Sequence, residues 1–175
     1  MTGLGGMAIE SAEQEKKIMT IQTSSVRSLL IPVHGQYLIV PNVAVAEVIP
    51  YQRANFVGKA PPWLLGAIGW RGLTVPVISY EAARGGSAMP AVTESRIAII
   101  NTIRGDGSVP FYAIVTAGIP RLYRVSHDCI QEREGRTGDM ESADLCQALI
   151  DGEAVVVPDL DALEELIARY WLRAA

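Results

Sequence analysis

Short apolar runs separated by turn residues fill most of the chain, and three pairs of these runs predict β-hairpins. Asp151-Gly152 separates the last pair, and this dipeptide supplies the positive φ angles that a two-residue type I′ turn needs. His34-Gly35 separates the first pair, and a longer loop over 104–108 separates the second. The six strands predicted in this way are Ser28–Val33, Gln36–Val40, Arg96–Ile103, Pro110–Thr116, Leu145–Ile150 and Glu153–Val157. Three hairpins in one short chain indicate an antiparallel, mainly β body.

Further strands are expected at Ala44–Ile49, Leu73–Ser79 and Ile119–Val125, which gives the spacing of short strands typical of a sandwich or barrel. Two segments, Glu81–Ser95 and Gln131–Asp144, show no apolar period and are expected to be loops. They divide the β body into two sheets or two small barrels.

The two ends of the chain also depart from this β pattern. Residues 1–25 show no strong periodicity and predict a tail. Near the C-terminus, apolar residues recur at helical spacing, namely Leu163, Leu166, Ile167, Tyr170 and Trp171. Asp161 and Glu164 stand at the spacing of a capping box. The pattern predicts one amphipathic helix whose aromatic stripe docks onto the β body.

Composition narrows the function classes. Hydrophobic residues make up 49% and charged residues 19% of the 175 residues, which is typical of a compact globular domain with apolar surface left for a partner. The net charge of −4 argues against a general nucleic-acid binder. Basic residues outnumber acidic ones from Arg27 to His127, whereas acidic residues dominate from Asp128 to Glu165, a stretch that is first interpreted as a solvated surface. No apolar run reaches the length that crosses a bilayer, so direct membrane insertion is not expected.

Side chains suited to catalysis or metal binding are scarce. The chain has two histidines and two cysteines, and Cys129 and Cys146 are too far apart for a Cys-x-x-Cys clamp, so no metal site and no cofactor are expected. Gly58-Lys59 lacks the opening glycine and the Ser or Thr of a P-loop. The start of the chain shows no apolar signal segment, which favours a cytoplasmic location.

The most informative segment runs from Glu47 to Tyr80. In it, Pro61-Pro62 predicts the start of a short helical turn that carries residues 63–65. Gly66 and Gly72 allow a bulge or close backbone approach on either side of a strand. Arg71 lies beside apolar neighbours, which predicts a partly sheltered guanidinium suited to a planar ion pair at an interface.

These motifs resemble the signature of CheW-like chemotaxis coupling proteins. The resemblance rests on Glu47-Val48, Ala60-Pro61-Pro62-Trp63-Leu64-Leu65-Gly66, Gly69-Trp70-Arg71-Gly72 and Val75-Pro76-Val77-Ile78. It continues through Arg96–Ile100, Phe111–Val115, Gly118-Ile119-Pro120, Leu122–Val125 and Asp151-Gly152 with the following Val155–Leu160.

The resemblance implies a mainly β fold, in which two intertwined five-stranded SH3-like barrels are followed by a C-terminal helix. It covers about residues 26–172, with residues 1–25 as an N-terminal tail and a linker near 81–95. The implied function is that of a non-catalytic adaptor in chemotaxis signalling. Such an adaptor couples the cytoplasmic tips of chemoreceptors (methyl-accepting proteins) to the regulatory domain of a CheA-type histidine kinase, which ends in a domain similar to CheW itself.

The resemblance also assigns candidate protein-binding residues. By motif position, Val45, Glu47, Gly66, Arg71 and Gly72 are expected to lie at, or to support, the surfaces that contact receptor and kinase. Arg71 is then the specificity charge, and Glu47 is its counterpart or a contact to a basic partner.

Two positions depart from the family pattern. Ser79-Tyr80 follows the Pro-Val-Ile run where many members carry an acidic residue, and Val115-Thr116 stands where Val-Asp is usual. These departures suggest a divergent branch, such as the accessory adaptors of type IV pilus (twitching motility) chemosensory systems.

Two other function classes remain open at this point. A small β-barrel can serve as a binding module for nucleic acid or another ligand, and the basic region from Arg27 to His127 is the support for that alternative. An enzyme ranks last, because the sequence offers no convergent nucleophile, base and orienting group.

Overall fold

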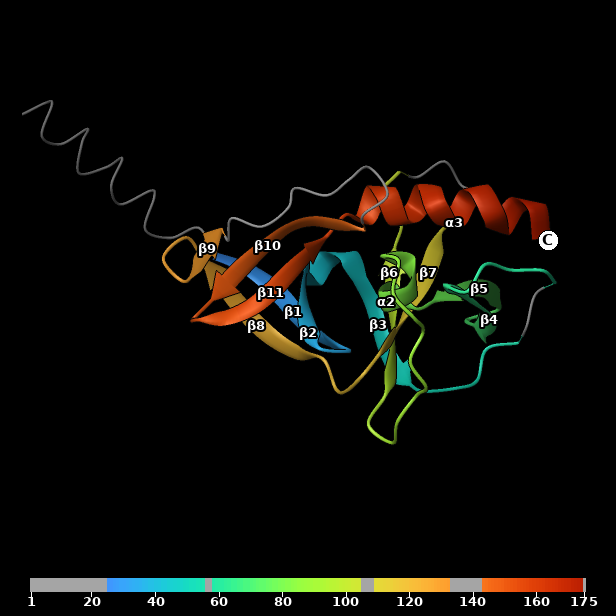
Figure 1. Ribbon diagram of the computed structural model, residues 1–175, viewed down its shortest axis with the longest axis horizontal. Helices are drawn as coiled ribbons and strands as arrows, with labels where there is room; N and C mark the ends of the chain where they lie inside the picture. Colours follow the sequence, from blue (N-terminus) through green and yellow to red (C-terminus); the bar gives the residue numbers. More distant parts are fainter. Residues whose placement is uncertain (1–24, 56–57, 105–108, 133–142, 175) are drawn as a thin grey trace, which may run out of the picture.

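The computed structural model describes residues 25–55, 58–104, 109–132 and 143–174, which form two β-sheets and a long C-terminal helix (Figure 1). Sheet A has the order β8-β1-β2-β11-β10-β9 and sheet B the order β3-β6-β7-β5-β4. The strands of sheet A are β1 (Ser25–Val33), β2 (Gln36–Pro41), β8 (Arg121–Ser126), β9 (Ile130–Glu132), β10 (Asp144–Ile150) and β11 (Glu153–Pro158). The strands of sheet B are β3 (Val45–Pro50), β4 (Leu64–Trp70), β5 (Leu73–Ile78), β6 (Arg96–Asn101) and β7 (Phe111–Thr116). The helices are the 3-10 turn η1 (Asn42–Ala44), α2 (Tyr80–Ala83) and α3 (Leu160–Ala174).

The two sheets are interleaved along the chain. The chain enters sheet A with β1 and β2, builds all of sheet B, and then returns to complete sheet A. Each sheet contains one parallel pair, β2 with β11 and β5 with β7, among antiparallel neighbours. The predicted mainly β fold with two β units and a C-terminal helix is confirmed. Sheet B has the expected five strands, whereas sheet A has six because the short β9 adds to β10.

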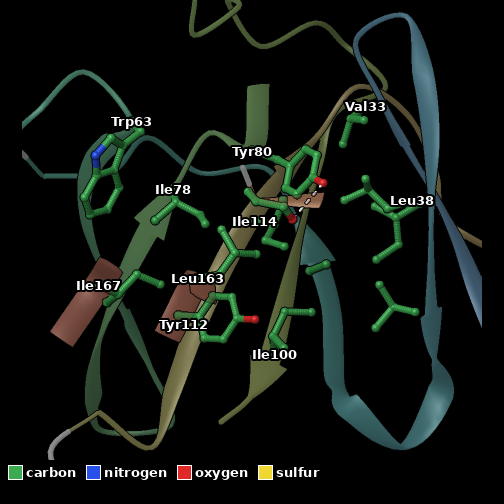
Figure 2. Close-up of a cluster of buried hydrophobic side chains, with 14 of the residues drawn as sticks. Val33, Leu38, Trp63, Ile78, Tyr80, Ile100, Tyr112, Ile114, Leu163 and Ile167 are labelled. Carbon is green, nitrogen blue, oxygen red and sulfur yellow. Dashed lines mark hydrogen bonds between the residues drawn. The ribbon is translucent and has the colours of Figure 1, made fainter. Parts of the chain in front are cut away.

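Strands at the centre of both sheets are buried on both faces. Along β6, Ile97 and Ile99 pack inside sheet B, whereas Ala98 and Ile100 enter the core between the sheets. In β1, Leu30 packs inside sheet A, while its neighbours face the core between the sheets, part of which Figure 2 shows. This double burial explains why the sequence shows continuous apolar runs here instead of strict alternation.

Helix α3 covers one end of the core between the sheets. Leu163 and Ile167 are fully buried in that core (Figure 2). Tyr170 meets Trp63 edge to face, with ring centroids 5.5 Å apart. The prediction that the helix docks its apolar and aromatic stripe onto the β body is confirmed.

The start of α3 differs from the prediction. The side chain of Asp159 accepts a hydrogen bond from the backbone N–H of Ala162 at 2.9 Å, so Asp159 is the N-cap. Glu164 takes no part in a capping box. Its carboxylate instead accepts the backbone N–H groups of Ile103 and Arg104 at 2.6 and 3.0 Å, which ties the helix to the end of β6.

Other local predictions were also wrong. Leu64 and Leu65 belong to strand β4, and only a turn over Pro62 and Trp63 precedes them, because pairing with β5 outweighs the helical start that the prolines favour. The expected loop at Glu81–Ser95 begins with the last residues of α2.

The loop expected at Gln131–Asp144 is bounded by strand residues on both sides. Gln131 and Glu132 pair in β9, and Asp144 begins β10. Residues 133–142 lie outside the described residues, as do 1–24 of the predicted tail.

A buried polar network joins the two sheets. The hydroxyl of Tyr80 donates to Asp144 Oδ1 at 2.5 Å and lies 3.1 Å from the backbone oxygen of Ala143. Arg84 forms an ion pair with the other oxygen of Asp144 at 2.8 Å. Burial, together with the hydrogen bond to Asp144, raises the pKa of Tyr80 far above its ordinary value, so the phenol stays protonated and donates. The end of sheet B is thereby fixed to the first residue of β10.

Replacing Tyr80 by Phe is expected to lower the free energy of unfolding by about 1–3 kcal/mol, because the Asp144 carboxylate then loses a buried donor. Urea denaturation followed by circular dichroism measures this loss. Tyr112 provides the matched control, since its buried hydroxyl has no hydrogen-bond partner among the described residues. Tyr112→Phe is expected to leave the stability unchanged or to raise it, and equal losses in both variants would contradict the assigned role of the network.

Candidate functional site

The β4–β5 hairpin ends in a two-residue turn that carries a charged side chain. Trp70 pairs with Leu73, and the two residues between them, Arg71 and Gly72, have φ angles of 48° and 78°. Both angles lie in the left-handed region that a type I′ turn requires. Glycine adopts this region freely, whereas an arginine there costs about 1 kcal/mol. The turn therefore holds Arg71 at a fixed place on the surface.

Glu47 on β3 binds this turn with one carboxylate oxygen. Its Oε2 forms an ion pair with Arg71 Nη2 at 2.9 Å and accepts the indole N–H of Trp70 at 3.0 Å. The guanidinium carbon of Arg71 lies 4.8 Å from the centroid of the Trp70 ring. We call Glu47, Trp70 and Arg71 the Glu47 cluster. Glu47 is thus the counterpart of Arg71, which is one of the two roles expected for it.

The exposure of Arg71 differs from the prediction. Its side chain is 67% exposed, so the guanidinium is not sheltered. Trp70 packs inside sheet B and against Phe111, with ring centroids 4.9 Å apart, and only its indole edge reaches Glu47. The apolar neighbours in the sequence thus belong to the core beneath the arginine and do not enclose its charge.

The Glu47 cluster bridges the two edges of sheet B. Strands β3 and β4 are the outermost strands of that sheet, and both edges meet at this cluster. Asn55, just beyond β3, adds two backbone hydrogen bonds with Ala67 of β4 at 2.8 and 2.9 Å. Sheet B is curled as a result, and the cluster sits where it closes.

Gly66 makes this closure possible from inside the sheet. It is buried at a register shift in β4, with a φ of 132°. A Cβ atom at this position would lie 2.1 Å from the backbone oxygen of Asn55. Gly66 therefore permits the close approach of Asn55 and has no side chain that a partner could touch.

Val45 points away from the Glu47 cluster. The pairing of β3 with β6 skips Ala46, which forms a bulge between Val45 and Glu47. After the bulge the alternation changes phase: Val45 and Val48 pack against the core between the sheets, whereas Ile49 packs inside sheet B. Of the five predicted residues, the structure brings Glu47, Arg71 and Gly72 together at the surface, and it places Gly66 and Val45 beneath.

A second surface was missed by the sequence interpretation. Ile119 and Leu122, just before and within β8, are 61% and 73% exposed, among the most exposed large apolar side chains in the described residues. Tyr123 and Val125 pack inside sheet A, so Leu122 faces outward on the alternating strand. The sequence predicted a strand here, but it contains no signal that distinguishes the outward from the inward apolar residues.

No catalytic or metal-binding group is evident at either surface. Within the described ranges, no three His, Cys, Asp or Glu side chains gather in a way that could hold a metal ion. Neither Cys129 nor Cys146 belongs to the Glu47 cluster. None of the helices in the described part of the chain is long and apolar enough to cross a membrane.

Comparison with known proteins identifies the family. A family model described as the CheW-like domain matches residues 27–166. This chain belongs to the CheW-like family. Its fold is similar to the crystal structure of the scaffolding protein TtCheW from Thermoanaerobacter tengcongensis, with a TM-score of 0.64 and 16% sequence identity over 78% of this chain and 90% of that chain. No curated protein sequence matches the chain.

Family membership establishes the class of function. CheW-like proteins are non-catalytic scaffolds of chemotaxis signalling, so this chain is an adaptor and not an enzyme. The match covers all the strands described above except the first two residues of β1. Both surfaces therefore belong to a domain whose work is binding other proteins.

Gly66→Ala is expected to destabilise the fold by more than about 2 kcal/mol, because the new methyl group collides with the Asn55 backbone at a positive φ. Thermal unfolding followed by circular dichroism measures the effect. Gly69→Ala in the same strand is the control, since a Cβ there has no neighbour within 4 Å, and its cost is expected to stay below about 1 kcal/mol. Equal effects of the two variants would show that Gly66 has no special role.

Proposed function

We propose that this CheW-like protein couples chemoreceptors to the regulatory domain of a CheA-type histidine kinase in the cytoplasm. The observation that carries the proposal is the Glu47 cluster, an exposed ion pair held on a rigid turn at the closure of sheet B. Such a group loses little conformational freedom on binding, because the backbone and the ring of Trp70 already restrict the arginine.

The kinase contact is assigned to the edge of sheet B. Arg71 offers a planar guanidinium with N–H groups beyond the one that Glu47 uses, and these have no other partner among the described residues, which suits a carboxylate or backbone oxygen of a partner barrel. Gly72 exposes backbone beside it. Gly66 and Val45 support the surface from within, since Gly66 allows the sheet to close and Val45 anchors β3 on the core.

The receptor contact is assigned to sheet A, at the exposed part of the face that elsewhere packs against sheet B. Ile119 and Leu122 expose apolar area that a folded domain does not need to leave in water. An amphipathic helix of a receptor tip can cover such side chains with its own apolar face. The two proposed contacts then lie on different sheets, so receptor and kinase can bind at the same time.

The pilus-linked branch rests on two sequence departures, and each has a local structural role. Ser79 caps α2 by accepting the backbone N–H of Ala82 at 3.3 Å, and Tyr80 belongs to the buried network with Asp144. Thr116 is buried and donates to the backbone oxygen of Gly118 at 2.6 Å. Assignment to a type IV pilus system therefore stays a prediction, and the genes adjacent to this one, pilus or flagellar, would test it.

Arg71→Glu is expected to abolish co-purification with the regulatory domain of a CheA-type kinase encoded in the same genome. The substitution places two carboxylates together at the surface, while the circular dichroism spectrum is expected to remain unchanged because the side chain is exposed. Binding that persists at wild-type strength would remove Arg71 from the contact.

The double variant Glu47→Arg with Arg71→Glu separates contact from internal support. It restores an ion pair of reversed polarity within the cluster. If Arg71 contacts the kinase directly, binding remains lost in the double variant. Recovery of binding would mean that the cluster acts only by closing sheet B.

A further inference from the structure

Two arginines face each other directly on sheet A, on the exposed part of the face that packs against sheet B further along β1. In the antiparallel pairing of β1 with β8, Arg27 lies opposite Arg124. Both are exposed, and residues directly opposite in such a pair project from the same face. Tyr123 and Val125 pack inside sheet A, so the alternating Arg124 projects outward, and Arg27 projects with it.

This arrangement is unfavourable within the isolated domain. Like charges directly opposite each other in a sheet repel. Neither guanidinium forms an ion pair or hydrogen bond with the residues that the structure describes. Arg121 on the same strand contrasts with them, because it pairs with Glu153 at 3.3 Å and stacks on Tyr37. Among the described residues, one arginine of β8 thus has an acidic partner, whereas the facing pair has none.

The arginine pair adjoins the exposed apolar side chains of the same surface. Leu122 lies two residues before Arg124 on β8 and projects on the same outward side. Strand β8 is also the last strand of sheet A and pairs with β1 alone among the described strands. No other described strand covers this edge, so a partner can approach it (Figure 1).

We propose that Arg27 and Arg124 form a carboxylate-binding pair that selects an acidic segment of the chemoreceptor docked on Leu122. The inference rests on the proposed function and adds the charge that the receptor must present. A carboxylate placed between two guanidinium groups removes their repulsion and gains charge-assisted hydrogen bonds. The partner is thus an amphipathic segment with apolar residues over Leu122 and Asp or Glu beside them.

The test measures binding of a purified cytoplasmic hairpin from a chemoreceptor encoded in the same genome. The double variant Arg27→Gln with Arg124→Gln is expected to bind roughly three- to tenfold more weakly in about 0.05 M salt. In about 0.5 M salt the variant and the wild type are expected to converge, because screening removes the contribution of the pair.

Arg169→Gln serves as the matched control for lost charge. Arg169 is exposed on α3, which lies well apart from β8 (Figure 1), and its substitution is expected to leave receptor binding unchanged. The melting temperature of the double variant is expected to stay equal or to rise, because a repulsion is removed. If the melting temperature and the receptor binding of the double variant both fall, the proposal is overturned in favour of a structural role for the two arginines.

The remaining outcomes are decisive in different ways. If the wild type fails to bind the hairpin, the proposed receptor coupling is wrong, and this inference falls with it. If the wild type binds and the double variant matches it in both salt conditions, only the arginine pair is excluded. If the double variant loses binding to phosphatidylglycerol vesicles but binds the receptor hairpin like the wild type, the pair recognises lipid phosphate instead.

Discussion

The core between the two sheets is the constraint on which the rest of the molecule depends. Strands β1, β2, β6 and β7 each contribute side chains to it from one face, while their other faces fill the interior of their own sheet. Since both faces are buried, neither sheet can slide or turn without exposing apolar area to water. The surfaces proposed for binding lie at the edges, where this requirement ends.

Much of the fold could be predicted because hairpin signals are local. Asp151-Gly152 has the positive φ angles that its sequence predicts, and the period of the C-terminal helix gave its buried side. The start of β4, at Leu64 and Leu65, could not be predicted in the same way. Its apolar residues fit a helix or a strand equally well, and pairing with β5, a contact made only in the fold, decides between them.

In the candidate site, too, some features could be predicted from local motifs, whereas others depend on how the strands pair. The proximity of Glu47 and Arg71 followed from motif position, and the ion pair is present. The orientation of Val45 did not follow, because it depends on a bulge at Ala46 that pairing with β6 creates. The facing arginines could not be predicted either, because nothing in the sequence shows that residue 27 lies opposite residue 124. Register and bulges are properties of paired strands, and neither strand encodes them alone.

The interleaving of the sheets has a consequence for synthesis on the ribosome. All strands of sheet B lie between Val45 and Thr116, so this sheet can assemble as soon as that stretch has emerged. Sheet A must wait, because Tyr37 in β2 pairs with Val155 in β11, near the end of the chain. Until then, the first hairpin can bury only the face that packs against sheet B. The strands that are synthesised first thus provide the edges and the core against which the last strands pair and pack.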